Sequence, residues 1–269
     1  MKTKLLVLLL ALTIILGLTS CGSKPSESIS DVDKLKVFAS QGDNLKKLGW
    51  NLDAPESWDY VEWAKVNGEL RLKTFAVNDQ ISELTGTLDL SDSIALERLD
   101  CGKNGLTSID VSNCLSLKVL GCGGNQLTSL DVSGCSALER LHCPENRLTS
   151  LDVSGLNSLT YLSCYANELI SLDLSDCSAL EMLFCGENQL AELNVSGLSS
   201  LKAMTCEKNQ LTSFDISGLN SLKVLDCSDN DIGKDELTSP GTHVKGINDI
   251  PAFVKWNEDI SAEGALFTF

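Results

Sequence analysis

The sequence predicts a β solenoid, in which short coils stack and place parallel strands side by side. The first observation is a column of seven cysteines spaced 21 residues apart: Cys101, Cys122, Cys143, Cys164, Cys185, Cys206 and Cys227. The second is an asparagine three residues after each cysteine. The third is an alternation of apolar and polar residues around each cysteine. A fixed period of this length indicates stacked copies of one small unit. Function is therefore expected on an extended surface rather than in a single pocket.

One unit, Leu127 to Arg147, reads LTSLDVSGCSALERLHCPENR. Within it Leu141 and Cys143 alternate with polar neighbours, which is the pattern of a strand with one buried face. Stacking the units sets these strands in a parallel sheet, about 4.8 Å apart. The asparagine follows the strand, where the chain turns inward. Because its amide carries both a donor and an acceptor, a column of asparagines can bond the buried backbone of adjacent turns.

The second half of each unit carries another alternation, L-x-x-L-D-V, as in Leu148, Leu151 and Val153. A unit of 21 residues that holds two such stretches and two turns has no room for a full helix. We therefore expect short strands or extended segments on the convex side, and a shallow arc overall.

The pattern L-x-x-L-x-C-x-x-N-x-L, with Leu138, Leu141, Cys143 and Asn146 in one copy, resembles the leucine-rich repeat family. The resemblance covers residues 85–231 as seven 21-residue repeats and is strongest to the short bacterial subclass. It implies a mainly β solenoid with a parallel concave sheet and short extended convex segments. It also implies an interaction surface, because these arcs commonly bind proteins.

Both ends of such a stack expose apolar edges and need caps. Residues 31–84 are predicted to form the N-terminal cap. We expect helix within Asp31 to Leu48, then a tryptophan-rich stretch, a turn at Asn67-Gly68 and a strand from Leu70 to Val77. This order resembles the N-terminal caps of leucine-rich repeat ectodomains, with large aromatic side chains in place of paired cysteines.

Residues 232–269, where the repeat pattern decays, are predicted to form the C-terminal cap. An acidic stretch near its start contains Asp229, Asp231, Asp235 and Glu236. Clustered hard oxygens can hold calcium. The spacing does not match an EF-hand loop, and we favour a solvated end of the stack over a metal site.

The N-terminus has the pattern of an export signal. Two lysines precede the apolar run Leu5 to Leu16, which is too short for a sound membrane span. The sequence Leu18-Thr19-Ser20-Cys21 resembles a bacterial lipobox, which implies cleavage before Cys21 and a lipid on that residue. Residues 1–20 are thus predicted to be a lipoprotein signal peptide and residues 21–30 a lipidated tether. The alternative is an ordinary signal peptide with a chance cysteine.

These signals place the protein on the extracytoplasmic side of a bacterial cell envelope, held to the outer membrane or cell surface by a lipid. The chain has 37 acidic against 21 basic residues, a net charge of −16. Such a chain will not bind nucleic acid or anionic lipid by electrostatics. We expect a monomer that faces solvent or a cationic partner.

Eleven cysteines in an exported protein ordinarily suggest a disulfide framework. Here seven occupy an inward strand slot where the family takes leucine. Three more, Cys114, Cys135 and Cys177, alternate with leucine at another apolar slot. We therefore expect free, buried thiols that pack as small hydrophobic side chains.

The sequence contains no motif for catalysis, a cofactor or a metal, and we expect no enzyme. Its two histidines are His142 and His243. His142 faces outward from the concave sheet, where the adjacent repeats offer Gly121 and Ser163. A serine beside a histidine is weak support for nucleophilic chemistry without a third group.

Function is expected on the concave face, whose outward slots vary from repeat to repeat while the inward slots do not. The outward rows converge on six residues: Arg140, His142, Tyr161, Tyr165, Met182 and Phe184. Solvent-facing aromatic side chains beside an arginine have the composition of binding hot spots. We predict that this patch binds a protein. Stacking of the aromatic rings on a glycan is the alternative, followed by an enzyme-accessory role through His142 and a passive coat protein.

Overall fold

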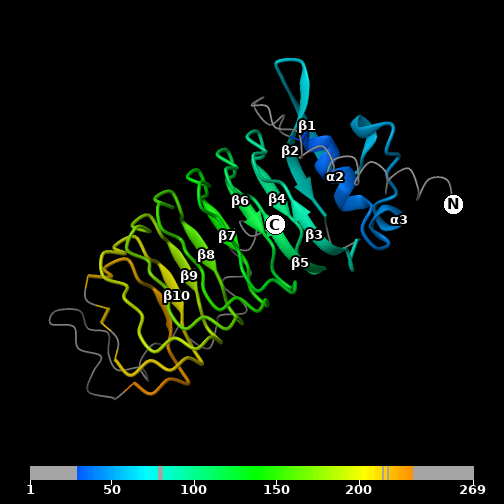
Figure 1. The fold of residues 1–269 in the computed structure, drawn as a ribbon. Coiled ribbons are helices and arrows are strands. Elements are labelled where there is room, and N and C mark those ends of the chain that lie inside the picture. The colour runs from blue at the N-terminus through cyan, green and yellow to red at the C-terminus, as the bar shows by residue number, and fades with distance from the viewer. Residues whose placement is uncertain (1–28, 78–80, 214, 217, 233–269) are drawn as a thin grey trace, which may run out of the picture.

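The fold was determined as a computed structural model, which describes residues 29–77, 81–213, 215–216 and 218–232. The predicted signal peptide, Cys21, most of the tether, the C-terminal cap beyond Ile232 and His243 lie outside the described residues. Figure 1 shows a stack of coils with two helices at its N-terminal end. Within the described ranges no helix is long and apolar enough to cross a membrane.

The concave side of the stack is one sheet of nine strands in the order β1-β2-β4-β6-β7-β8-β9-β10-β11. Its strands are β1 Val61–Val66, β2 Glu69–Ala76, β4 Arg98–Asp100, β6 Val119–Gly121, β7 Arg140–His142, β8 Tyr161–Ser163, β9 Met182–Phe184, β10 Ala203–Thr205 and β11 Val224–Asp226. From β2 onward every neighbouring pair is parallel. From β4 onward each residue pairs with the one 21 positions later, as in Leu141 with Leu162. The predicted leucine-rich repeat solenoid with a parallel concave sheet is confirmed.

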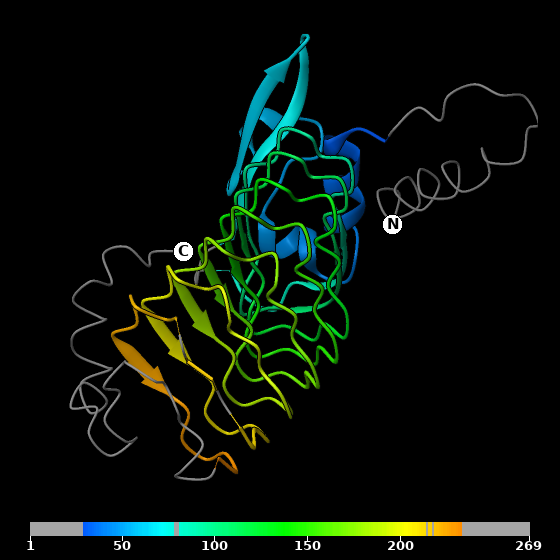
Figure 2. The ribbon, with the colours of Figure 1, turned by 90° about the vertical axis from the view of Figure 1, so that its left-hand side faces the viewer.

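The opposite side carries little sheet. Strands β3 (Thr85–Asp89) and β5 (Gly105–Asp110) form a two-stranded parallel sheet, and a single bridge joins Asp110 to Asp131. The described part of the later coils runs there as extended segments and turns without further strands. Figure 2 shows the strands along one side of the stack and these loops on the other. The predicted short convex segments are confirmed.

A ladder of asparagine side chains joins each coil to the one before it. The Nδ2 atom of Asn125 donates to the carbonyl of Cys101 in the preceding coil, at 3.1 Å, and to that of Cys122 in its own coil, at 2.9 Å. Its Oδ1 accepts the N–H of Leu106, at 3.0 Å. Asn146, Asn167, Asn188, Asn209 and Asn230 repeat this arrangement. The predicted pairing of turn backbone by asparagine is confirmed.

The interior is filled by leucine, valine and cysteine. Ten cysteines lie in the described ranges, and all are buried and free of disulfides, as predicted. Burial raises the pKa of the thiols, to about 12 for Cys114 and Cys164 and to about 11 for Cys135. At neutral pH these thiols are protonated and shielded from oxidants, and they pack as apolar groups.

The N-terminal cap begins with helix α2 (Asp31–Ala39), followed by α3 (Asn44–Leu48) and the short 3₁₀ helix η1 (Pro55–Ser57). The side chain of Ser30 accepts the N–H of Asp33, at 3.1 Å, and so caps α2. Gly42 separates the two α-helices with a φ of +51°, a conformation that suits glycine. The helix expected within Asp31 to Leu48 is confirmed, as two helices on either side of Gly42.

Buried contacts hold this cap together and join it to the first coil. The Asp31 carboxylate accepts the N–H of Leu72 and the hydroxyl of Ser93, both at 2.9 Å. The rings of Trp50 and Trp58 stack with centroids 4.4 Å apart and planes 3° from parallel. Aromatic packing and a buried hydrogen-bonded carboxylate therefore close this end of the stack.

Replacement of a ladder asparagine is expected to destabilise the fold strongly. Asn146→Ala leaves buried carbonyls and the N–H of Leu127 without their partner. Each buried unsatisfied group costs about 1–3 kcal/mol, so we expect the free energy of unfolding to fall by about 3 kcal/mol in urea titrations. Asn157→Ala, at an exposed turn, is the matched control and should change it by less than about 0.5 kcal/mol. Equal losses in the two variants would contradict the role assigned to the ladder.

The buried thiols predict a sharp loss of stability in alkali. Above about pH 9 the thiols of the unfolded chain ionise, whereas those of the folded chain stay protonated, since their pKa values are about 11 or higher. The unfolded state then binds fewer protons, and the free energy of unfolding falls as pH rises. Each thiol contributes about 1.4 kcal/mol per pH unit. Ten together can exceed the stability of a typical domain, so unfolding is expected between about pH 9 and 10.5.

Urea titrations from pH 7.5 to 9.5 measure this slope. The comparison variant replaces Cys114, Cys135 and Cys177 with leucine, which stands at the equivalent position of other coils, as in Leu156. Its free energy of unfolding should fall with pH about three-tenths less steeply. An unchanged slope would show that the thiols do not control the alkaline transition.

Candidate functional site

The concave face is built from rows of side chains that point away from the core. In each short strand the middle residue, such as Leu141 or Leu162, is fully buried, so the residues on either side of it point outward. The sheet register aligns Arg140 with Tyr161 and His142 with Ser163 on neighbouring strands. The outward rows thus follow the order predicted from the cysteine column.

Four of the predicted site residues form one aromatic cluster across β7, β8 and β9. The guanidinium carbon of Arg140 lies 5.1 Å from the ring centroid of Tyr161, within the range of a cation–π contact. The Tyr161 ring is 5.5 Å from that of Phe184, at 55°. The imidazole of His142 lies 6.3 Å from Tyr161. The chain brings these groups together because one residue in every 21 occupies the same outward slot.

The prediction that these aromatic rings face solvent is wrong for Tyr161 and Phe184. Their exposed fractions are 8% and 9%, because the rings pack against each other and against their neighbours. Arg140, His142 and Met182 are half-buried and border the pair. The result is an ordered, tightly packed patch with little open ring surface.

Tyr165 belongs to a second group. It follows the end of β8, and its hydroxyl is hydrogen-bonded to the carboxylate of Glu187. Burial is the main factor that raises the pKa of Tyr165. Glu187 also pairs with Lys208 on the next coil. The structure therefore places Tyr165 in a polar chain at the edge of the concave face.

The protonation state of His142 follows from its surroundings. Burial, together with the nearby Arg140 guanidinium, lowers the pKa of His142 to about 4, so the imidazole is neutral at physiological pH. A base with so low a pKa is poorly matched to proton abstraction near neutrality. Within the described ranges, no group of three or more His, Cys, Asp or Glu side chains is placed to hold a metal ion.

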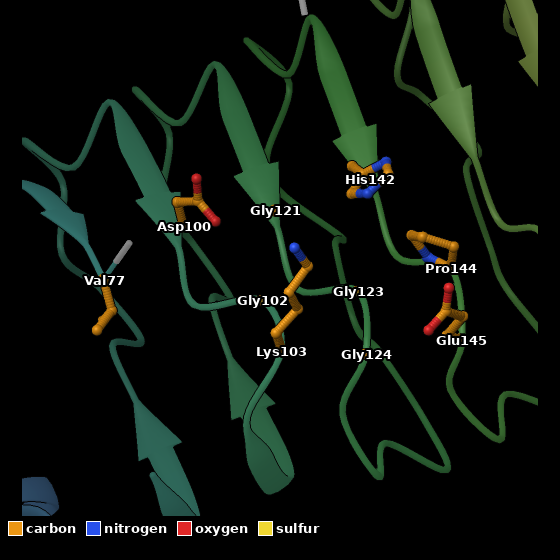
Figure 3. Close-up of a pocket in the computed structure, with 10 residues that line it drawn as sticks. All are labelled: Val77, Asp100, Gly102, Lys103, Gly121, Gly123, Gly124, His142, Pro144 and Glu145. Carbon is orange, nitrogen blue, oxygen red and sulfur yellow. The ribbon is translucent and has the colours of Figure 1, made fainter. Parts of the chain in front are cut away.

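A cleft of about 290 Å³ opens next to the aromatic cluster, and the sequence did not predict it. Figure 3 shows Asp100, Lys103, His142, Pro144 and Glu145 around it. Its floor is formed by glycines on neighbouring coils, at Gly102, Gly121 and Gly123. A signal was present in the sequence, since these glycines occupy outward slots that carry larger side chains in later repeats.

Comparison with known proteins returns no matching family model and no matching curated protein. The fold is similar to that of several solved bacterial proteins. The functional domain of InlJ from Listeria monocytogenes, which includes a cysteine ladder, is 32% identical over 54% of this chain and 37% of that one, with a TM-score of 0.47. YopM from Yersinia enterocolitica is 32% identical over 56% of this chain and 32% of that one, at 0.48. A leucine-rich repeat protein from Leptospira interrogans is 22% identical over 61% of this chain and 54% of that one, at 0.49. The chain thus spans between about a third and about half of the length of these proteins.

Proposed function

We propose that this protein is a lipid-anchored, extracytoplasmic leucine-rich repeat protein that binds a protein partner through its concave face. The observation that carries the proposal is the contrast between inward and outward slots of the same strands. The inward positions hold leucine and cysteine in coil after coil, with Met204 on β10 as an exception, whereas the outward position at His142 holds glycine, serine and phenylalanine in neighbouring coils. Folding constrains the inward set most strongly. A varied outward set on a rigid sheet provides a surface specific for one partner.

The packing of the aromatic cluster favours a protein over a glycan. Stacking on a sugar requires an open ring face, and little of Tyr161 or Phe184 reaches solvent. Contact with a protein instead profits from side chains that are already ordered, because less rotamer entropy is lost on binding. Arg140 and Met182 border the pair, and both residue types are enriched at protein interfaces.

The lipid anchor is proposed from the lipobox that ends at Cys21. The described chain begins at Ile29, just before α2, at the end of the stack furthest from β11. The eight-residue interval from Cys21 to Ile29 spans at most about 28 Å. Anchoring at this end would hold the cap near the membrane and leave the concave sheet accessible.

Site-directed photo-crosslinking on intact cells tests the binding face. A photoreactive amino acid at Met182 should give a discrete crosslinked product, and one at Ser150, on an exposed loop, should not. Arg140→Glu in the Met182 background should reduce the product at least about tenfold, because it reverses the charge beside the aromatic pair. Arg147→Glu makes the same change at an exposed site of the same coil and should leave the product unchanged. Equal products from Met182 and Ser150, or equal effects of the two arginine variants, would show that the concave patch is not the binding site.

Lipidation at Cys21 is tested by membrane fractionation and mass spectrometry. We expect the mature protein to begin at Cys21, to carry acyl chains there and to sediment with membranes. Cys21→Ala should release it into the soluble fraction while its thermal unfolding midpoint stays the same, because the residue precedes the fold. A mature protein that starts elsewhere, or that stays membrane-bound after Cys21→Ala, would exclude the anchor.

A further inference from the structure

The cleft beside the aromatic cluster has the size and the lining expected of a site for one flat side chain. At about 290 Å³ it is at the lower limit of small-molecule pockets. Its floor lacks side chains, since Gly121 is followed two residues later by Gly123, and Gly102 of the preceding coil lies next to Gly123. The imidazole of His142 stands on one side and the carboxylate of Asp100 on the other (Figure 3).

The Asp100 carboxylate is oriented across this floor. Its Oδ2 atom accepts from the guanidinium of Arg98, with 3.3 Å between nitrogen and oxygen. Its Oδ1 atom lies 3.1 Å from the position that a Cβ atom would take on Gly121, and 3.9 Å from that position on Gly102. A larger residue at position 121 would therefore cover Oδ1. The glycine leaves this oxygen above the floor of the cleft.

We propose that the cleft receives the guanidinium group of an arginine side chain projected by the protein partner. A guanidinium is planar and weakly hydrated, stacks on aromatic rings and binds carboxylates through more than one N–H. The cleft offers a flat floor, the His142 ring as a wall and the Asp100 carboxylate at its edge. A carboxylate has about four acceptor sites, so Asp100 can bind a second guanidinium while it keeps Arg98.

The charges around the cleft support a cationic occupant. Asp100 and Glu145 line it, and Lys103 is the one cation among the ten lining residues. His142 brings no positive charge near neutral pH, because its pKa is about 4. Lys103 is exposed, and as a cation that lines the cleft it competes with an incoming guanidinium for the Asp100 carboxylate. The net charge of −16 attracts cations over a longer range.

This inference rests on the proposed function, since it supplies an anchor point for the same partner. His142 links the two sites: it lines the cleft and also lies 6.3 Å from the Tyr161 ring. An arginine in the cleft would set a partner in register over Arg140, Tyr161 and Phe184. The cleft can nevertheless be tested alone, because a free arginine derivative probes it without the partner.

The test is an NMR titration of the mature chain, made without its lipid by Cys21→Ala, with Nα-acetyl-arginine amide. In a His243→Gln background His142 is the only histidine, so its imidazole signals report on the cleft. We expect a saturable shift with a millimolar dissociation constant. Nα-acetyl-lysine amide should bind at least about threefold more weakly, and Nα-acetyl-glutamate amide should give no saturation.

Three variants identify the groups involved. Asp100→Asn should weaken binding at least about fivefold, and Lys103→Gln should strengthen it, because a competing cation is removed. Gly121→Phe should abolish binding, because its side chain would cover Asp100 Oδ1. The variant should still fold, as checked by thermal unfolding, since Phe184 occupies the equivalent position three strands away on β9. Asp226→Phe, the same slot on β11, is the control and should bind the arginine derivative normally.

The absence of a saturable shift, equal affinity for the lysine or glutamate derivative, or normal binding to Gly121→Phe would overturn the proposal. The titration tests the cleft and the crosslinking experiment tests the proposed function, and the two can fail independently. If the arginine derivative binds but crosslinking at Met182 gives no product, the cleft stands and the protein-binding face fails. If crosslinking succeeds and the derivative does not bind, the partner uses the concave patch without an arginine in the cleft.

Discussion

The structure depends on the hydrogen bonds that each ladder asparagine makes with two coils at once. Asn146 donates to the carbonyl of Cys122 in the coil before it and to that of Cys143 in its own, and accepts the N–H of Leu127. Without this side chain the inward turn would bury unpaired backbone groups. Because the same amide serves both coils, it fixes their spacing and their register. The register in turn aligns the outward residues into rows, so that the concave patch exists only because the ladder does.

The cysteine column has a polar role that the sequence did not reveal. Cysteine was expected to act only as a small hydrophobic side chain in a slot where leucine is usual. The Sγ atoms of Cys101, Cys143 and Cys185 lie 3.4–3.6 Å from a backbone carbonyl of the next strand, within hydrogen-bonding range for sulfur. Leucine offers no such donor. The column therefore packs the core and also adds weak bonds between coils, parallel to the asparagine ladder.

The sequence predicted the features that repeat in every coil. It did not predict features that depend on which different side chains happen to stand on neighbouring coils. The period gave the sheet register and the outward position of Arg140 and His142, since both follow from the position of the cysteine. It did not give the mutual burial of Tyr161 and Phe184, because that depends on which two rings stand on adjacent strands. Nor did the period reveal the cleft. The cleft depends on the missing side chain at Gly121 and on the Asp100 carboxylate of the neighbouring strand, which lies beside the space that the glycine leaves open. Contacts between the outward side chains of neighbouring coils have no period, and only the structure shows them.

The division between buried inward residues and solvent-facing outward residues is incomplete at the centre of the concave face, because outward side chains on β8, β9 and β10 are also buried. Most outward residues contribute little to folding, because they contact solvent. Tyr161 and Phe184 are nearly as buried as the core, so the packing of their rings outside the sheet adds to stability on β8 and β9. A surface ordered in this way loses little entropy when a partner docks. The cluster also lies between two chemically different regions, the cleft at Asp100 on one side and the half-buried carboxyl of Glu207 on the other, whose pKa burial raises. A partner that binds across all three can do so in only one orientation, because the two ends of the face are not equivalent.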